Sequence, residues 1–252
     1  MSVSVNSKPT TLADNTLDRL LTEALRAKDA SKPPRDHSYF HDSAAGSCLR
    51  QRVLRRAGYE SAPLQADDLR NFGFGHMVHE LIQSALLSKG AIPLENGKPL
   101  LERSVKSENG GGTYDCLVDL DGDGQLTLMD IKTCSVFAFA HLKKEGAKKN
   151  HQMQVCRYWL KLKDKYPIRD VRIYYLEKDK GWTREFGIPM SEKLIQETLD
   201  DIKLEQSAWL IYEKDQTLPP MIPASSDRAW ECKYCALAAH CEGKQTVSKY
   251  FQ

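Results

Sequence analysis

The sequence of 252 residues lacks any long apolar segment. Its longest unbroken apolar runs have five residues each, at 136–140, 208–212 and 235–239, whereas a membrane-spanning helix needs about 20. The first residues, MSVSVNS, also lack the basic start and the apolar stretch of a secretory signal. We therefore expect a cytoplasmic protein with no membrane partner.

The sequence also lacks an excess of charge of either sign. Lys and Arg total 36 and Asp and Glu total 34, which gives a formal net charge of +2. Bulk charge therefore neither requires nor excludes a nucleic-acid partner. Apolar residues make up 41% of the chain and charged residues 28%, a composition that is typical of a folded globular protein and too apolar for a disordered one.

Apolar periodicity predicts one α/β domain with a helical first third and a Cys-rich tail. The pattern predicts helices over 11–28, 43–57, 67–88, 151–165 and 191–212, and strands over 100–105, 113–120, 126–132, 171–176 and 184–188. The first three strands are expected to be antiparallel, with turns supplied by the glycine-rich segment 109–112 and the acidic segment 121–124. Ser191 is expected to cap the last helix.

The seven cysteines are an odd number in a chain without an export signal, which argues against a disulfide framework. Cys232 and Cys235 are separated by two residues and followed by Cys241, a spacing typical of metal or cluster ligands. Cys48 is the best candidate for a fourth ligand, although His240 is an alternative in a zinc site. The spacing alone does not separate zinc from iron and sulfide. The remaining cysteines are expected to be packing residues: Cys116, Cys134 and Cys156.

Three residues on two neighbouring predicted strands carry the chemistry of a metal-dependent phosphodiesterase. Asp130 and Lys132 are two residues apart on a strand and therefore point to the same face. Asp115 lies on the preceding strand. Such a hairpin can hold a hard divalent cation by its carboxylates and place an ammonium group beside bound water. The sequence therefore predicts a site that cleaves phosphodiester bonds.

Further polar residues extend this site. His79 lies in a predicted helix and is a candidate imidazole ligand, and Gln154 and Tyr158 share one helical face. Two basic segments, 141–161 and the helix that follows Cys48 and contains Arg50, suit a phosphate backbone, although charge runs are usually solvated surface.

The segment from Asp119 to Asp130 nearly satisfies the calcium loop of an EF-hand. That motif needs a helix on each side, whereas glycines precede the segment and a β-type Leu-Thr-Leu fills its second half. Its last ligand is also Asp where a bidentate Glu is expected. We therefore interpret the segment as a hairpin connection.

In combination, these motifs resemble the RecB-like branch of the PD-(D/E)xK nuclease superfamily, and within it the iron–sulfur exonucleases typified by the CRISPR-associated Cas four family and the AddB nuclease domain. The resemblance runs from Cys48 to Cys241. The matching motifs, in the family's order, are Cys48-Leu-Arg50, Gly75-x-x-x-His79, Asp115, Asp130-Ile-Lys132, Gln154-x-x-x-Tyr158, and the cysteines 232, 235 and 241.

The resemblance implies a restriction-endonuclease-like core with a central mixed sheet flanked by helices. It implies a [4Fe–4S] cluster on the four cysteines, and Mg²⁺ or Mn²⁺ held by His79, Asp115, Asp130 and the Ile131 carbonyl. It further implies cleavage of DNA from an end, with Lys132 assisting the attacking water. DNA would be aligned by Gln154 and Tyr158 and contacted by Arg50. Residues 1–40 would be a helical extension to a nuclease domain of residues 41–252.

Two alternatives remain open. One is a DNA-end-binding scaffold with a structural cluster and an idle nuclease site, and the other is a Cys₄ zinc protein with a calcium loop. An exonuclease of this kind has two conceivable settings, CRISPR spacer acquisition with an integrase as partner, or phage or bacterial recombination with a strand-annealing recombinase.

Overall fold

The computed structural model of the chain describes residues 16–241. The helices are α1 (Thr16–Ala30), α2 (Leu49–Arg56), α3 (Ala66–Ser88), α4 (Val136–Glu145), α5 (Lys149–Leu162), α6 (Glu192–Asp215) and α7 (Trp230–Lys233), with short 3₁₀ turns at Asp42–Ala44 and Ala238–His240. The strands are β1 (Leu94–Glu95), β2 (Lys98–Pro99), β3 (Leu101–Ser107), β4 (Gly110–Val118), β5 (Leu126–Cys134), β6 (Ile168–Glu177) and β7 (Thr183–Gly187). None of the helices in this range combines the length and apolarity needed to cross a membrane.

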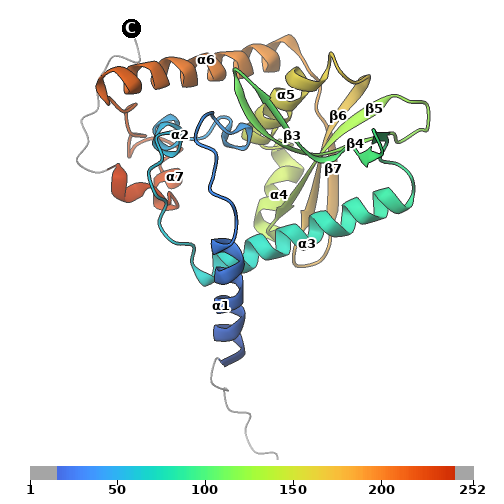
Figure 1. The fold of residues 1–252 in the computed structure, drawn as a ribbon, viewed down its shortest axis with the longest axis horizontal. Coiled ribbons are helices and arrows are strands. Elements are labelled where there is room, and N and C mark those ends of the chain that lie inside the picture. Colours follow the sequence, from blue (N-terminus) through green and yellow to red (C-terminus); the bar gives the residue numbers. More distant parts are fainter. Residues whose placement is uncertain (1–15, 242–252) are drawn as a thin grey trace, which may run out of the picture. The chain divides into compact units, whose positions relative to one another are not determined.

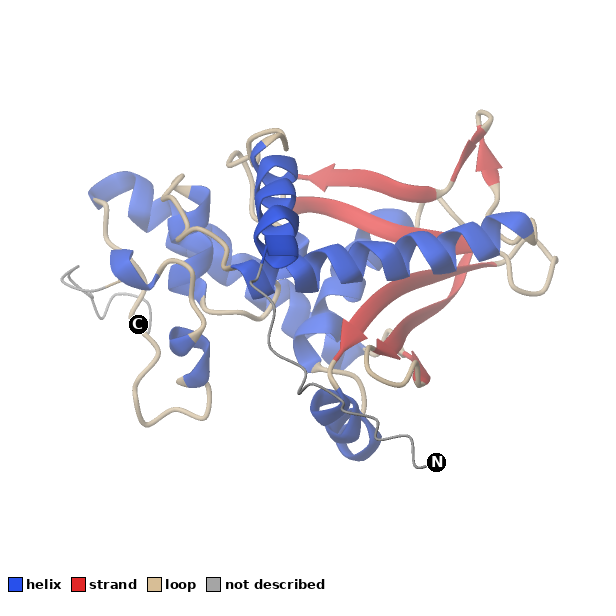
Figure 2. Cartoon of the chain, turned by 90° about the horizontal axis from the view of Figure 1, so that it is seen from below, coloured by secondary structure: helices blue, strands red, loops and turns tan. Residues whose placement is uncertain are grey.

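The central element is a five-stranded sheet in the order β3-β4-β5-β6-β7, and β1 and β2 form a separate small hairpin. The β5–β6 pair is parallel and every other pair of the large sheet is antiparallel. Helices α4 and α5, which connect the two parallel strands, pack on the sheet (Figures 1 and 2). The mixed sheet flanked by helices that the sequence resemblance implied is confirmed.

Two compact units can be distinguished among the described residues. One contains residues 16–34 and Leu64–Phe74, and the other contains Arg35–Pro63 and residues 75–241. The predicted helix 11–28 begins in the described part of the chain at Thr16, and residues 11–15 lie outside it. Every predicted site residue belongs to the second unit. The predicted boundary at residue 40 stays a prediction.

The predicted helix 43–57 is wrong in its first half. Asp42–Ala44 form one 3₁₀ turn, and α2 begins only at Leu49. Between them Gly46 adopts φ +67°, a left-handed conformation that glycine accepts without steric cost and that interrupts a right-handed helix. The sequence analysis also missed α4, which follows β5 almost directly. Ser135 begins it by accepting a hydrogen bond from the Ala138 N–H (3.3 Å).

The glycine run at 110–112 is not the predicted turn but the first part of β4. Two of its glycines are required by their surroundings. Gly110 has φ +120°, and a side chain there would meet the Phe40 carbonyl oxygen at 2.7 Å. A side chain at Gly112 would meet the Tyr158 hydroxyl at 2.8 Å. The glycines therefore let other segments approach the strand closely.

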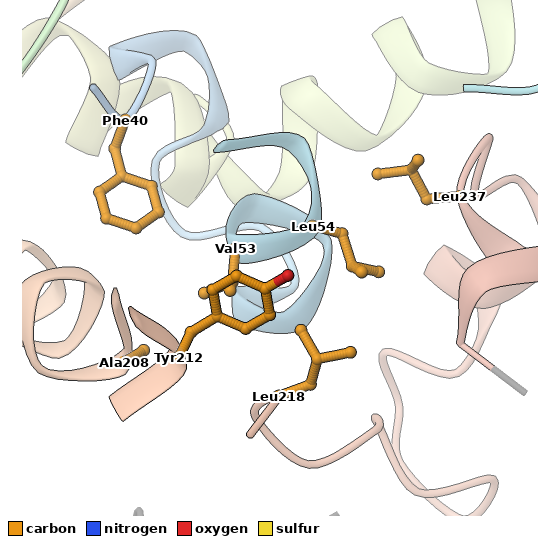
Figure 3. Close-up of a cluster of buried hydrophobic side chains, with 7 residues drawn as sticks. All are labelled: Phe40, Val53, Leu54, Ala208, Tyr212, Leu218 and Leu237. Atoms are coloured by element: carbon orange, nitrogen blue, oxygen red, sulfur yellow. The ribbon is translucent and has the colours of Figure 1, made fainter. Parts of the chain in front are cut away.

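A cluster of buried side chains joins α2 to α6 and to the Cys-rich tail (Figure 3). Its members are Phe40, Val53, Leu54, Ala208, Tyr212, Leu218 and Leu237. Cys235 and Cys241 pack against it. Because burial of each large apolar side chain contributes about 1.5–3 kcal/mol, this cluster helps to hold the tail against α2.

Four buried charged residues connect α2, α5 and α6. Arg52 contacts Asp201 (2.9 Å) and Glu205 (2.6 Å), and Arg157 contacts the same two carboxylates (2.5 and 2.9 Å). Both guanidinium groups are therefore neutralised inside the protein. The expectation that the basic segments as a whole face a phosphate backbone is wrong for these two arginines.

Candidate functional sites

The carboxylate site forms where the β4–β5 ladder opens. The ladder pairs Val118 with Thr127 and Cys116 with Met129, and it ends there. Asp115 and Asp130 are the next residues on the two strands. Instead of continuing the ladder, the Ile131 N–H donates a hydrogen bond to Asp115 Oδ2 (2.5 Å). The strands thereby hold two carboxylates next to each other in a buried environment.

Lys132 extends toward Asp130, as their spacing on one strand predicts. The Lys132 Nζ lies 2.7 Å from Asp130 Oδ2. Asp130 is 1% exposed, and its Oδ1 accepts no hydrogen bond from any of the described residues 16–241. A buried carboxylate oxygen without a donor is costly, so this atom is suited to contact a cation.

His79 and Glu102 complete the constellation. His79 on α3 places its Nδ1 3.8 Å from Asp115 Oδ1 and 3.7 Å from Glu102 Oε1. Within residues 16–241, His79, Glu102 and Asp115 are the one set of three such ligands whose atoms all lie within 4.8 Å of one another. The structure thus brings together two of the predicted ligands and adds Glu102.

Glu102 could not be predicted from the sequence, because no spacing relates it to the other acids. It lies on β3 between residues that pair with β4 on either side of Asp115. Its backbone has φ +47°, which is uncommon for a residue with a side chain. The Gln83 amide donates a hydrogen bond to Glu102 Oε1 (2.6 Å) and orients the carboxylate. Strand pairing opposite Asp115 is the only signal that would have found it.

The charges of this site depend on one another. Burial, with a further contribution from Asp130, raises the pKa of Asp115 to about 7. Burial disfavours the Lys132 ammonium, but the Asp130 and Asp115 carboxylates outweigh it and raise the Lys132 pKa. Burial also opposes the His79 imidazolium, yet Glu102 and Asp115 raise the His79 pKa. The Asp115 carboxyl group therefore holds a proton more readily than a free aspartate does, and a bound cation would compete with that proton.

The donor set fits a hard divalent cation, because carboxylate oxygens and an imidazole are ligands that Mg²⁺ and Mn²⁺ accept. His79, Glu102 and Asp115 are close enough to share one ion, and the Asp130 Oδ1 adds a buried acceptor without a donor. Ile131 reaches the site through its backbone N–H. Its carbonyl as a ligand stays a prediction.

Gln154 and Tyr158 lie on α5 and face each other, with the Gln154 Nε2 3.4 Å from the Tyr158 hydroxyl. Both side chains are buried. Tyr158 also lies against Gly112 on β4, so it joins α5 to the sheet. Alignment of a DNA strand by this pair stays a prediction.

The four predicted cluster cysteines line one cavity of about 140 Å³. Cys48 lies directly before α2, and the other three belong to the tail that contains α7: Cys232, Cys235 and Cys241. The Gln51 amide donates to Cys235 Sγ (3.3 Å), and the Glu231 carboxylate accepts from the Cys48 N–H (3.1 Å). The structure therefore brings together residues that are almost two hundred positions apart. The other cysteines are buried away from it, as expected: Cys116, Cys134 and Cys156.

Arg50 is fully buried and connects the two parts of the cysteine site. Its guanidinium donates to the carbonyl oxygens of Pro219 (2.8 Å) and Cys241 (3.0 Å). Because these bonds hold the guanidinium inside the protein, it does not reach a DNA backbone in this conformation. Its observed contacts are structural and fasten the tail to α2.

The acidic segment 119–124 connects β4 to β5, as interpreted, and no helix flanks it among the described residues. Asp119 accepts hydrogen bonds from the Gly122 and Gly124 N–H groups (2.8 and 3.0 Å). Asp123 pairs with Arg169 (2.8 Å). In these contacts the acidic side chains stabilise the turn between β4 and β5. The segment therefore does not have the architecture of an EF-hand.

Comparisons with known proteins find similarity of structure only. No family model matches the sequence, and no curated protein matches it. The chain is similar in fold to the crystal structure of SSO0001, with a TM-score of 0.51 and 19% identity over 91% of this chain and 98% of that one. An alkaline exonuclease, LHK-Exo from Laribacter hongkongensis, gives a TM-score of 0.48 with 14% identity over 77% of this chain and 97% of that one. Its complex with dAMP gives 0.47 with 14% identity over 71% of this chain and 94% of that one.

Proposed function

We propose that this protein is a metal-dependent DNA exonuclease of the RecB-like, iron–sulfur type. The observation that carries the proposal is the meeting of Asp115, Asp130 and Lys132 at the opening of one hairpin. Residues chosen from the sequence for phosphodiester hydrolysis lie together there, with a histidine and a further carboxylate beside them. Such a set of groups is best suited to hydrolysing a phosphodiester bond, because it can offset the negative charge of the phosphate during the reaction.

Each residue has a distinct role in this proposal. His79, Glu102 and Asp115 would hold Mg²⁺ or Mn²⁺, with Asp130 as a further ligand. The bound ion would lower the pKa of a coordinated water and offset negative charge on the scissile phosphate. Lys132, held by Asp130, would orient that water and stabilise charge that develops on the phosphate oxygens.

We propose a [4Fe–4S] cluster at the four cysteines. A tetrahedral zinc site with bonds of about 2.3 Å keeps its sulfur atoms less than about 4 Å apart. Among the described residues, no three cysteine sulfurs lie within 4.8 Å of one another. His240, the alternative zinc ligand, instead contacts the Glu60 carbonyl oxygen through Nε2 (2.9 Å). This contact engages His240 Nε2 and leaves the four cysteines as the donor set, which is the set that would hold a [4Fe–4S] cluster.

DNA with a free end would be the substrate, and an end-trimming enzyme would serve either of two settings. In CRISPR spacer acquisition it would prepare DNA for an integrase. In phage or bacterial recombination it would supply single strands to a strand-annealing recombinase. We propose a role in one of these two processes.

The test is anaerobic purification followed by metal analysis and a nuclease assay on single and double strands labelled at the 5′ or the 3′ end. The wild type is expected to contain iron and sulfide and to degrade DNA from an end with Mg²⁺ or Mn²⁺. Asp115→Asn and Lys132→Gln are each expected to abolish degradation while the protein stays folded. Asp121→Asn, an exposed acid of the same hairpin, is the matched control and should retain activity.

Full activity in the Asp115→Asn or Lys132→Gln protein would contradict the proposal. Binding of DNA ends without degradation in any divalent metal would favour a scaffold with an idle site. A colourless protein with zinc and no iron would contradict the cluster.

A further inference from the structure

A groove of about 690 Å³ lies between α4, the α4–α5 connection and the start of α7. We call it the α4 groove and define it by Phe137, His141, Lys148, Lys149 and Trp230. No role has been given to it so far. All the residues that line the groove belong to the second unit. Its position and its lining indicate that it binds a ligand.

A tyrosine on β6 connects the strand that carries Lys132 to the groove. Lys132 on β5 is the register partner of Tyr175 on β6, so the two side chains point to the same face of the sheet. The Tyr175 hydroxyl accepts a hydrogen bond from the Lys148 N–H (3.3 Å) and lies 2.8 Å from His151 Nδ1. Tyr175 therefore lies beside Lys132 in the sheet and contacts Lys148 in the wall of the groove.

The groove also presents aromatic side chains that nothing covers in the described chain. Phe137 is 74% exposed and Trp230 is 63% exposed. The Phe137 ring meets the His141 ring edge-on, with centroids 4.8 Å apart. Large exposed aromatic groups cost hydration free energy unless they serve contacts. α4 begins four residues after Lys132, so Phe137 lies on the helix that follows the strand of that lysine, whereas Trp230 lines the groove from α7.

Positive charge accompanies the rings. The Lys148 ammonium has no carboxylate within ion-pair distance among residues 16–241. Lys149 pairs with Glu197 at the surface, and Glu145 lies 3.7 Å from His141. Lys148 therefore brings positive charge to the wall of the groove. Exposed aromatic rings beside lysine side chains are the elements of a surface that stacks bases and neutralises phosphates.

We infer that the α4 groove binds a single strand of DNA, with Phe137 and Trp230 stacking on bases and Lys148 contacting the phosphate backbone. The inference rests on the proposed function, because the strand would be the one that enters or leaves the carboxylate site. It assigns the groove to single-stranded rather than duplex DNA, because paired bases do not expose their faces to a protein ring.

The test measures equilibrium binding of a short fluorescent oligothymidylate by anisotropy in EDTA, where no cleavage occurs. Phe137→Ala and Trp230→Ala are each expected to weaken binding about tenfold, whereas Trp230→Phe retains most of it. Lys148→Gln is expected to lower the dependence on salt by about one phosphate contact. Phe72→Ala, a helical and exposed phenylalanine outside the groove, is the matched control and should bind as the wild type does.

Two outcomes overturn the inference. One is wild-type affinity in both alanine variants, which would leave the groove to a protein partner. The other is an equal loss of affinity in Phe72→Ala. The proposed function fails separately: groove-dependent binding without degradation in Mg²⁺ or Mn²⁺ supports the groove and contradicts the nuclease. Circular dichroism of each variant checks the fold.

Discussion

The Ile131 N–H donates a hydrogen bond to Asp115 Oδ2 (2.5 Å), across the point where the β4–β5 ladder opens. This bond replaces the next rung of the ladder. It fixes one carboxylate oxygen to the backbone between Asp130 and Lys132 and directs the Oδ1 atom of Asp115 toward His79 (3.8 Å). The geometry of the site is therefore set by the backbone, and substitutions at its rim should change ion binding without unfolding the sheet.

Glu102 gives the first prediction. If Glu102 shares an ion with His79 and Asp115, Glu102→Gln removes one negative ligand and should weaken Mn²⁺ binding about tenfold or more. Isothermal titration calorimetry of the protein with Mn²⁺ alone measures this. Glu108→Gln, at an exposed acid in the turn that follows β3, is the control. Unchanged Mn²⁺ affinity in Glu102→Gln would show that this carboxylate only orients His79.

The cysteines give the second prediction. If the four cysteines hold the proposed iron–sulfur cluster, Cys48→Ser and Cys235→Ser should each lose its brown absorbance and its iron, because each removes a thiolate from the shared cavity. Cys116→Ser and Cys156→Ser are the controls and should keep both, since these thiols are buried elsewhere. Iron and sulfide analysis with visible absorption, without oxygen, measures the result. Equal iron content in all four variants would contradict the assignment.

The sequence allowed most of the fold to be predicted, because amphipathic helices and short alternating strands carry a local signal. The start of α6 and its Ser191 cap are examples: the Leu194 N–H donates to Ser191 Oγ (3.3 Å). The start of α2 was missed because Gly46 interrupts a pattern that reads as one helix. The role of the glycines at 110–112 was missed because the need for them comes from Phe40 and Tyr158, which are distant in the sequence.

Site residues that belong to a sequence motif could be predicted from the sequence, and site residues outside any motif could not. Asp130 and Lys132 are related by spacing, whereas Glu102 enters only because β3 pairs with β4. Burial was the least predictable property. Arg50 and Arg157 read as surface charge, yet both are enclosed, because their partners lie more than forty residues away in the sequence.

The buried ion pairs give the third prediction. Arg157 is completely buried between Asp201 and Glu205, and Arg157→Met leaves these carboxylates without part of their compensation. The free energy of unfolding should fall by about 3–5 kcal/mol. Arg172→Met, which removes a surface contact with Asp170 and Glu185, should cost less than about 1 kcal/mol. Urea unfolding followed by circular dichroism compares the two. A cost for Arg157→Met no larger than that for Arg172→Met would contradict the importance of the buried network.

His151 gives the fourth prediction, on the dependence of stability on pH. Burial, with the Lys132 and Lys148 charges nearby, lowers the pKa of His151 to about 3, from an ordinary value of 6.5. Between these two values the unfolded chain binds a proton that the folded protein does not, so stability rises with pH across this window and is lost as the pH falls. Each unit of the difference corresponds to about 1.4 kcal/mol. Because His151 Nδ1 also meets the Tyr175 hydroxyl, replacing it by a neutral amide keeps a polar partner.

His151→Gln should therefore flatten the loss of unfolding free energy from pH 6.5 downward, by a few kcal/mol at most. The measurement is a series of urea unfolding curves across this range. His141→Gln, an exposed histidine on α4, is the control and should keep the wild-type slope. A wild-type slope in His151→Gln would mean that other groups determine the acid sensitivity. A flat profile in both variants would show that the effect is not specific to the buried imidazole. The expected pattern, a change in His151→Gln alone, would establish that the buried His151 imidazole stays neutral in the folded protein.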